Sequence, residues 1–392
     1  MTEVSIVRCA DYSRDKCTQA IEDVLQPFGG LDWVKPGMRI AIKANLVSAM
    51  KPETAATTHP ALLAALTRAL VDRGASVVVG DSPGNLYNAA VLNRVYSVTG
   101  MHAVEEAGGE LNHNFEVKEA VFEQAHIARH FSYTAWLDEA DAIISFCKLK
   151  SHGMMCLSAA TKNLFGAVPG TMKPEYHFRY PDPLDFAGMI IDLNDYFKPT
   201  LYLVDAVLAM EGNGPTAGTP RQMGALLAGK DCHKIDMVCS KLIGLDPMAV
   251  PTLKAAMNYG LISGNVEDIS VEGDVDAFIL PDFERIERGR GMQFETVLPG
   301  KLGLLFGKIA KKALRSSPKL KKSECVGCGL CANVCPAKAI TIKAKKAQVD
   351  YKRCIRCFCC QEFCPKGAMK VHRPWPARVL YYFFIKSLKS FL

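Results

Sequence analysis

Two runs of cysteine near the C-terminal end constrain this chain more than any other feature. Both have the pattern Cys-x-x-Cys-x-x-Cys-x-x-x-Cys-Pro, and the second repeats the first after 29 residues. The runs consist of Cys325, Cys328, Cys331 and Cys335, and of Cys354, Cys357, Cys360 and Cys364. Thiolates at this spacing can wrap a turn of backbone around one metal cluster, and the proline stops the chain from continuing as a helix. The repeat therefore predicts cysteine-bound metal clusters.

The spacing resembles that of bacterial ferredoxins, which hold two [4Fe–4S] clusters and in which the fourth cysteine of each run binds the cluster of the other run. The resemblance implies one cluster on Cys325, Cys328, Cys331 and Cys364, and a second on Cys354, Cys357, Cys360 and Cys335. A zinc site is the main alternative, but zinc ribbons use two Cys-x-x-Cys pairs rather than two runs of four. Cys359 matches no position of the motif, and we expect it to be a bystander.

The other cysteines give no sign of a disulfide framework. Six of the 15 lie outside the runs without ligand spacing, and we expect them to be buried free thiols. They are Cys9, Cys17, Cys147, Cys156, Cys232 and Cys239. This usage favours a reducing compartment, and residues 1–10 contain no apolar stretch long enough for a signal peptide. A cytoplasmic location is the expectation.

Charge is distributed unevenly along the 392 residues. Residues 1–295 carry 26 Lys and Arg against 37 Asp and Glu, whereas residues 296–392 carry 21 against three. Two oxidised clusters with their thiolates would subtract about two charges each, so the C-terminal excess persists. The sequence therefore predicts a basic C-terminal module attached to an acidic body.

The N-terminal three quarters alternate short apolar segments with amphipathic ones, which favours a mostly parallel sheet covered by helices on both faces. Strands are expected at 4–7, 39–43, 77–79, 142–146, 201–204 and 224–228, with short strands over 268–280. Helices are expected at 13–25, 58–74, 184–196, 233–243 and 253–259. The expected fold class is α/β, plus a small α+β ferredoxin-like dicluster domain.

Four parts are expected along the chain. They are an α/β body at 1–290, a basic amphipathic helix and linker at 291–323, a 2[4Fe–4S] ferredoxin domain at 324–372 and a basic aromatic tail at 373–392. In the linker, residues 301–315 place their apolar side chains on one stripe of a helix. Within the ferredoxin domain, short strands are expected at 339–342 and 347–349.

Polar residues follow the predicted strands of the body, at the sheet edge where open α/β folds bind ligands. The candidates for binding a cofactor or substrate are Asn45, Asp81, Ser82, Gly84, Lys148, Asn163, Asp205 and Glu211. The candidate catalytic residues are His152, Lys150 and Lys162, and His152 is the first choice as proton donor. If these strand ends converge, they form a pocket suited to an anion.

These candidates also have structural explanations. Residues 81–84 make a good turn by composition alone, and Lys148 and Lys150 could equally lie on a solvated edge. A single histidine such as His152 is more often a satisfied core or surface residue than a catalyst. The common dinucleotide and P-loop sites are disfavoured because Gly-x-Gly-x-x-Gly does not follow the first strand and Gly-x-x-x-x-Gly-Lys-Ser/Thr does not occur.

Four segments, taken in chain order, resemble the family catalogued as domain of unknown function 362. They are Gly80–Gly84, Lys148–His152, Ser158–Gly170 and Asp205–Pro215. The resemblance covers roughly residues 1–290 and implies a shared fold and pocket. Members are often fused to a ferredoxin domain. The family has no settled activity, so the resemblance carries no catalytic role to this chain.

The end of the chain combines an apolar, aromatic run at 379–385 with basic residues. The run is too short to span a bilayer, but a helix of this kind can lie in the membrane interface. Peripheral membrane contact through residues 374–392 is therefore one expectation, and packing on the body or on a partner is the alternative. Nucleic acid is a weaker candidate partner because no recognised binding module is present.

Two main hypotheses follow for function. In the first, the clusters pass electrons to or from a reaction in the body, with a redox protein as donor or acceptor. The pocket would then hold an anionic small molecule or a flavin, although no flavin motif is present. In the second, the protein is a non-enzymatic adaptor or electron relay within a larger redox complex. A non-redox enzyme with structural clusters is a third alternative.

Overall fold

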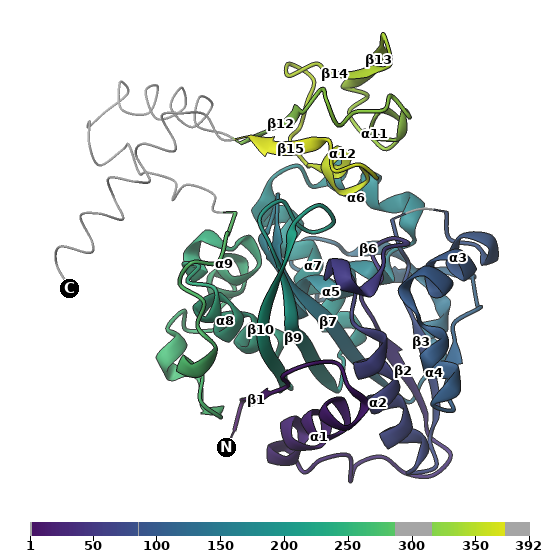
Figure 1. Ribbon diagram of the computed structural model, residues 1–392, viewed down its shortest axis with the longest axis vertical. Helices are drawn as coiled ribbons and strands as arrows, with labels where there is room; N and C mark the ends of the chain where they lie inside the picture. Colours follow the sequence, from purple (N-terminus) through teal and green to yellow (C-terminus); the bar gives the residue numbers. More distant parts are fainter. Residues whose placement is uncertain (1, 85, 287–315, 373–392) are drawn as a thin grey trace, which may run out of the picture. The chain divides into compact units, whose positions relative to one another are not determined.

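The computed structural model describes residues 2–84, 86–286 and 316–372 (Figure 1). The chain divides into two compact units, Met1–Ile286 and Glu287–Leu392. The first unit ends within a few residues of the position expected for the end of the α/β body. The amphipathic helix expected at 301–315 and the tail at 373–392 lie outside the described residues.

A nine-stranded mixed sheet forms the centre of the first unit, in the order β11-β1-β10-β9-β7-β2-β3-β4 with β8 paired to β7 off this path. Its strands are β1 (Val4–Arg8), β2 (Arg39–Lys43), β3 (Ser76–Gly80), β4 (Glu110–Leu111), β7 (Ala142–His152), β8 (Cys156–Ser158), β9 (Leu201–Glu211), β10 (Thr219–Gly229) and β11 (Val271–Glu272). The run β9–β7–β2–β3–β4 is parallel, as is β1–β11, whereas β1–β10, β10–β9 and β7–β8 are antiparallel. The predicted mostly parallel sheet is confirmed.

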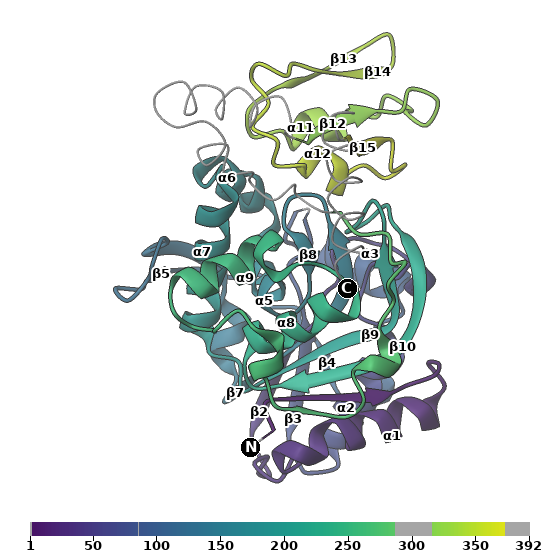
Figure 2. The same ribbon diagram turned by 90° about the vertical axis from the view of Figure 1, so that its left-hand side faces the viewer.

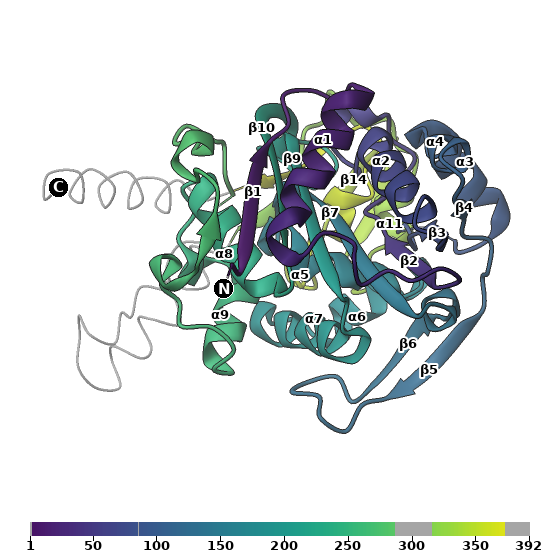
Figure 3. The same ribbon diagram turned by 90° about the horizontal axis from the view of Figure 1, so that it is seen from below.

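Helices cover both faces of this sheet (Figure 3). On one face lie α1 (Arg14–Leu25), α2 (Pro60–Val71), α3 (Ala89–Thr99) and α4 (His102–Glu106). On the other lie α5 (Ala160–Asn163), α7 (Pro183–Phe197), α8 (Cys232–Leu242) and α9 (Pro251–Asn258), and α6 (Lys173–Arg179) precedes α7. In α2, Leu62, Leu66 and Leu70 recur at helical spacing and pack in one buried core with Ile40 and Val77 of the sheet. The Nδ1 atom of His59 caps this helix by accepting a hydrogen bond from the Ala61 N–H.

Three differences from the sequence-based expectation are the clearest. Strands β7 and β9 each have 11 residues and extend well beyond 142–146 and 201–204. The short strands expected over 268–280 are reduced to β11, which is flanked by 3₁₀ turns. Helix α3 and the hairpin of β5 (Val117–Val121) and β6 (His130–Thr134) were not predicted. The longer strands matter most, because they place Lys148, Lys150 and His152 inside a strand rather than after it.

The second unit contains two small antiparallel sheets (Figure 2). Strand β12 (Ser317–Leu320) pairs with β15 (Met369–His372), and β13 (Ile340–Lys343) pairs with β14 (Lys346–Val349). Two single-turn helices, α11 (Leu330–Asn333) and α12 (Cys359–Glu362), contain the third cysteines of the two runs, Cys331 and Cys360, at corresponding positions. Since β12 belongs to this fold, the structured unit begins by residue 317 rather than at residue 324 as expected.

Within the described part of the chain, no helix is long and apolar enough to cross a membrane.

Candidate functional site

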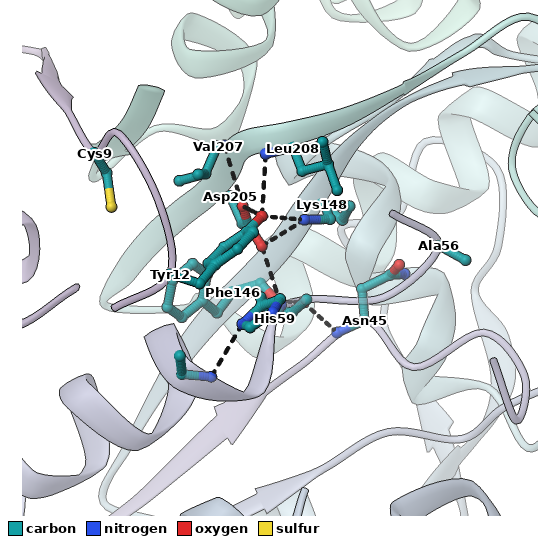
Figure 4. Close-up of polar contacts among 12 residues, drawn as sticks. Cys9, Tyr12, Asn45, Ala56, His59, Phe146, Lys148, Asp205, Val207 and Leu208 are labelled. Atoms are coloured by element: carbon teal, nitrogen blue, oxygen red, sulfur yellow. Dashed lines mark hydrogen bonds and ion pairs between the residues drawn. The ribbon is translucent and has the colours of Figure 1, made fainter. Parts of the chain in front are cut away.

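A buried ion pair links the two central strands of the body (Figure 4). Lys148 lies directly opposite Asp205 in the parallel register of β7 and β9, and its Nζ is 2.7 Å from Asp205 Oδ2. The same Nζ lies 2.8 Å from the hydroxyl of Tyr12, which donates to Asp205 Oδ1 at 2.9 Å. Asp205 also accepts from the backbone N–H groups of His59 and Val207. This carboxylate is therefore engaged by the protein itself.

The aromatic side of this network comes from two segments far apart from β9 in the sequence. The rings of Tyr12 and His59 stack with centroids 3.5 Å apart and planes 6° apart (Figure 4). Burial lowers the pKa of His59 to about 4, because Asp205 offsets that effect only partly. The imidazole is neutral near pH 7, which agrees with its acceptance of the Ala61 N–H at Nδ1.

A second lysine and aspartate pair lies at the ends of the neighbouring strands. Lys43 is the last residue of β2, and its Nζ lies 2.7 Å from Oδ1 of Asp81, which directly follows β3. Asp81 also accepts from the N–H groups of Leu46 and Ser82. Gly166 packs against the pair so closely that an added Cβ would overlap both Asp81 Oδ1 and the Nζ of Lys43. The glycine is therefore required by the pair rather than by a turn.

Lys150 differs from both of these lysines. It is fully buried, and its Nζ donates to Oδ1 of Asn45 at 2.6 Å and to the carbonyl of Ala56 at 2.7 Å. Both partners are neutral. Burial, reinforced by the charge of Lys162, lowers the pKa of Lys150 to about 7. A lysine in this state exchanges a proton near neutral pH, so it can act as an acid, a base or a proton-linked binding group.

The remaining candidates from this edge lie close by in the chain. Asn163 at the end of α5 donates from Nδ2 to the carbonyl of Lys43 and to the hydroxyl of Ser145. Lys162 is half-buried, with its Nζ 5.7 Å from the Phe165 ring centroid. Ser82 donates its N–H to the carbonyl of Gly166, and Gly84 donates to that of Val47. The structure thus brings the ends of β2, β3 and β7 together with α5.

Two candidates have local structural roles. The Nδ1 atom of His152 accepts hydrogen bonds from the N–H groups of Met154 and Met155, each at 3.1 Å, in the turn between β7 and β8. This fully buried imidazole thus stabilises a turn. Such a structural role is the alternative to catalysis that a single histidine leaves open. Glu211, at the end of β9, accepts from the N–H of Glu284.

The sequence missed three contributors to the site, namely Tyr12, Lys43 and His59. Lys43 ends a predicted strand and could have been found by the same rule that found Asn45. Tyr12 lies four residues after β1 and could have been found by the same rule, whereas only the packing of distant segments reveals His59. The solvated edge considered for Lys148 and Lys150 is excluded, because both are at most 1% exposed.

The first expected cluster site is assembled in the second unit. Cys325, Cys328, Cys331 and Cys364 line one cavity, together with apolar residues such as Ile342 and Met369. Burial, and then the neighbouring thiols of Cys364, Cys328 and Cys325, raise the pKa of Cys331 to about 11. The structure therefore places Cys364, the fourth cysteine of the second run, beside the first three cysteines of the first run.

The members of the second expected ligand set also lie near one another in this unit. Burial, together with the neighbouring thiols of Cys357 and Cys335, raises the pKa of Cys354. Cys335 and Cys360 also belong to one buried cluster of side chains, against which Cys354 packs. Cys359 is buried beside Cys357, whose thiol it contacts, and does not line the first cavity.

The residues around the thiols fit iron–sulfur clusters. The Ala339 N–H donates to the sulfur of Cys335 at 3.2 Å, and the Ala368 N–H donates to that of Cys364 at 3.1 Å, so the two fourth cysteines have matched environments. Among the described residues, no three His, Cys, Asp or Glu side chains are arranged around a single metal ion. Thiols spread around a cavity suit a multi-iron cluster, which exchanges one electron at a time when bound.

Each of the two units contains a region that matches a known protein family. Residues 40–241 match the family described as domain of unknown function 362, and residues 317–365 match the 4Fe–4S dicluster domain. The first match covers more than half of the chain. The protein belongs to the domain of unknown function 362 family. The second match identifies an iron–sulfur domain of the kind that transfers electrons, and it begins at the residue where β12 begins.

A thylakoid-associated protein of Synechocystis sp. is 31% identical to this chain over 265 residues, which are 66% of this chain and 79% of the relative. Among solved structures, the lactate racemase apoprotein of Thermoanaerobacterium thermosaccharolyticum aligns at 12% identity with a TM-score of 0.40 over 60% of this chain and 56% of that one. A Thermotoga maritima protein aligns at 11% identity with a TM-score of 0.36 over 55% of each chain. This chain thus spans little more than half the length of either solved structure.

Proposed function

We propose that this family member is an iron–sulfur oxidoreductase in which two [4Fe–4S] clusters pass electrons to or from a reaction in the α/β body. The observation that carries the proposal is the gathering of Cys325, Cys328, Cys331 and Cys364 around one cavity. The position of Cys364 beside the first run supports two clusters, because this exchange of fourth cysteines is the pattern of two-cluster ferredoxins. The body is far larger than a simple carrier needs, which supports a reaction there.

The lysine-rich strand ends supply the chemistry that such a reaction needs. Buried ammonium groups stabilise negative charge in a setting of low dielectric, and Lys150 can release or take up a proton near pH 7. An anionic small molecule is therefore the proposed substrate. The proposed electron donor or acceptor is a second redox protein, which the basic C-terminal module would attract if its surface is acidic.

The proposed location is cytoplasmic with peripheral membrane contact. The relative from Synechocystis is a thylakoid-associated protein, which is compatible with this proposal. The contact would be made by the basic aromatic residues 374–392, which lie outside the described residues.

Anaerobic purification followed by iron and sulfide analysis tests the clusters. We expect about eight irons per chain in matured protein and bleaching of the cluster absorbance by dithionite. An iron content near four would contradict two clusters. The reaction is tested by mixing reduced protein with the small-molecule fraction of cells, without oxygen, and following reoxidation of the clusters.

In that second assay, wild type and Lys118→Met should be reoxidised by the small-molecule fraction, and Lys150→Met should not. Lys118 is a suitable control because its ion pair with Asp138 is on the surface. Equal rates for all three proteins would contradict a reaction at Lys150.

An electron relay within a larger complex is the second candidate function. The burial of the candidate residues favours this relay function, because the side chains of Lys148, Lys150 and His152 are not open to solvent. A relay would be reoxidised by a partner protein at the same rate in wild type and Lys150→Met. Its clusters would not respond to the small-molecule fraction.

A further inference from the structure

In its ammonium form, Lys150 has one hydrogen-bond donor to spare. An ammonium group has three N–H donors, and two of them are used by Asn45 Oδ1 and the carbonyl of Ala56. Within the described residues the third has no acceptor. A buried ammonium is costly to maintain unless its charge and its donors are matched, so the unmatched donor indicates a missing partner.

The neighbouring lysines show what a matched arrangement looks like here. Lys43 is paired with Asp81, and Lys148 is paired with Asp205, each at 2.7 Å. All three lysines are at most 1% exposed. Lys150 has no carboxylate within ion-pair distance among the described residues, although it lies in the same environment. The missing partner should therefore be negatively charged.

Three buried polar side-chain atoms without partners in the described part of the chain belong to the segments after β2 and β3 and to α5. The hydroxyls of Ser82 and Thr57 and the Oδ1 atom of Asn163 are buried and have no hydrogen-bond partner among the described residues. Ser82 follows Asp81, and Thr57 follows Ala56, the residue whose carbonyl accepts from Lys150. Such atoms are rarely left unpaired in native proteins unless a ligand or water completes them.

We propose that Lys150, Ser82 and Thr57 form a binding site for the oxyanion group of a small carboxylate or phosphate ligand, and that Lys150 gains a proton when this ligand binds. The site deepens the proposed function, on which it rests for its role. The third N–H of Lys150 and the two hydroxyls donate to the oxyanion, and Asn163 Oδ1 accepts from a hydroxyl of the same ligand.

Proton uptake follows from the charges that face Lys150. Lys162 of α5 and Lys148 of β7 disfavour its ammonium form, whereas Asp81 after β3 and the thiol of Cys147, if ionised, favour it. Together with burial they lower the pKa of Lys150 to about 7, so the amine is about half protonated at pH 7. An anion at contact distance stabilises the ammonium and raises this pKa. Binding should therefore take up about half a proton at pH 7, more at pH 8 and little at pH 6.

Isothermal titration of the full-length, cluster-loaded, oxidised protein tests the site. The probes are inorganic phosphate and, separately, acetate and succinate, each titrated in two buffers that differ in ionisation enthalpy. We expect saturable binding of phosphate or of a carboxylate, and the difference in heat between the buffers gives the number of protons taken up. Tighter binding of phosphate would identify the ligand as a phosphate, and tighter binding of acetate or succinate would identify it as a carboxylate.

Variants assign the effect to residues. Lys150→Met should weaken binding at least about tenfold and abolish proton uptake, while Lys150→Arg should bind without proton uptake because a guanidinium stays charged. Ser82→Ala and Thr57→Val should each weaken binding and leave proton uptake unchanged. Lys118→Met is the surface control, and the cluster absorbance and circular dichroism of each variant verify its fold.

The proposal is overturned if none of the three anions binds saturably at millimolar concentration, or if binding to Lys150→Met equals that of wild type. Binding without proton uptake in wild type also overturns it. The measurement uses oxidised protein without a reductant, so failure of electron transfer to the body would leave it unaffected. The two proposals can therefore fail separately.

Discussion

Asp205 is a structural carboxylate, although its place after a strand indicated a binding residue. It neutralises Lys148 and joins Tyr12 and His59 to the centre of the sheet (Figure 4). Its donors come from four segments of the chain. A residue in this position holds the strands in register for the neighbouring site, and it has little capacity left for a ligand.

Replacing this carboxylate should destabilise the body. We expect Asp205→Asn to lose about 3–5 kcal/mol of unfolding free energy, because removing one partner leaves the buried ammonium of Lys148 uncompensated. Chemical denaturation followed by circular dichroism measures the change. Asp282→Asn is the matched control, since its ion pair with Arg221 is exposed and should matter little. An equal effect of the two substitutions would contradict the structural role of Asp205.

A second buried carboxylate should control the pH dependence of stability. Asp236 accepts the N–H groups of Ala160 and Thr161 at the start of α5, but burial outweighs these bonds and raises its pKa from 3.8 to about 7. Between these two values the folded protein binds more protons than the unfolded chain. Asp236 therefore makes stability fall as the pH rises from about 4 to about 7.

The difference between wild type and Asp236→Asn isolates this contribution. We expect the unfolding free energy of the variant, relative to wild type, to rise by on the order of 3–4 kcal/mol between pH 4 and pH 8, from a shift of about three units at 1.36 kcal/mol each. Denaturation midpoints at several pH values give the curve. Parallel curves for the two proteins would show that the carboxyl does not titrate in this range.

At the scale of elements, strand β7 shows how burial overrides local sequence. Its mainly apolar run ends at Cys147, just before the two lysines, yet all 11 residues of the strand are buried. The strand continues through both lysines because each donates to buried acceptors. Lys148 donates to Asp205 and Tyr12, and Lys150 donates to Asn45 and Ala56. A charged residue is compatible with a buried strand only when its partners arrive from elsewhere in the chain.

The two cysteine loops form a second pair of mutually dependent elements. Because Cys364 joins the set of the first run, Cys364→Ala and Cys325→Ala should each remove about four of about eight irons. The double variant should lose no more than either single change, since both act on one cluster. Iron analysis of anaerobically reconstituted protein measures this result.

Combining Cys364→Ala with Cys354→Ala is the matched comparison. These residues lie in the same run but belong to different clusters, so the pair should lose nearly all iron. Cys359→Ala should keep all of it, because Cys359 lies outside both ligand sets. A double variant of Cys325 and Cys364 that loses all iron would contradict the exchange of fourth cysteines.

At the scale of the molecule, the chain joins an acidic body to a basic C-terminal quarter. Basic residues with aromatic neighbours favour contact with anionic lipid, and each such residue near the surface adds about 1 kcal/mol of attraction. We expect the full chain to float with anionic liposomes, and a chain without residues 374–392 to remain in the dense fraction. High salt should release the bound protein, because the attraction is screened.

The matched control uses liposomes of neutral lipid, with which neither protein should float. Equal flotation of the full and shortened chains on anionic liposomes would contradict membrane contact through residues 374–392. Packing of the tail on the body or on a partner protein would then be the remaining expectation.

The sequence by itself determined the family, the dicluster domain and the alternating α/β pattern, and it predicted the cluster ligands. These features depend on short-range spacing, since a cysteine loop, a helix stripe and a strand can each be recognised within about 15 residues. It also predicted a site at this edge of the sheet, because Asn45, Asp81, Lys148 and Lys150 follow the predicted strands.

Only the tertiary structure decided what each of these residues does there. Lys148 and Lys150 are two residues apart on the same strand, yet one meets Asp205 and the other meets only neutral oxygens. The difference depends on which distant segments pack beside each side chain. Solvation and charge pairing, and with them the pKa of Lys150, are set by those contacts rather than by local sequence.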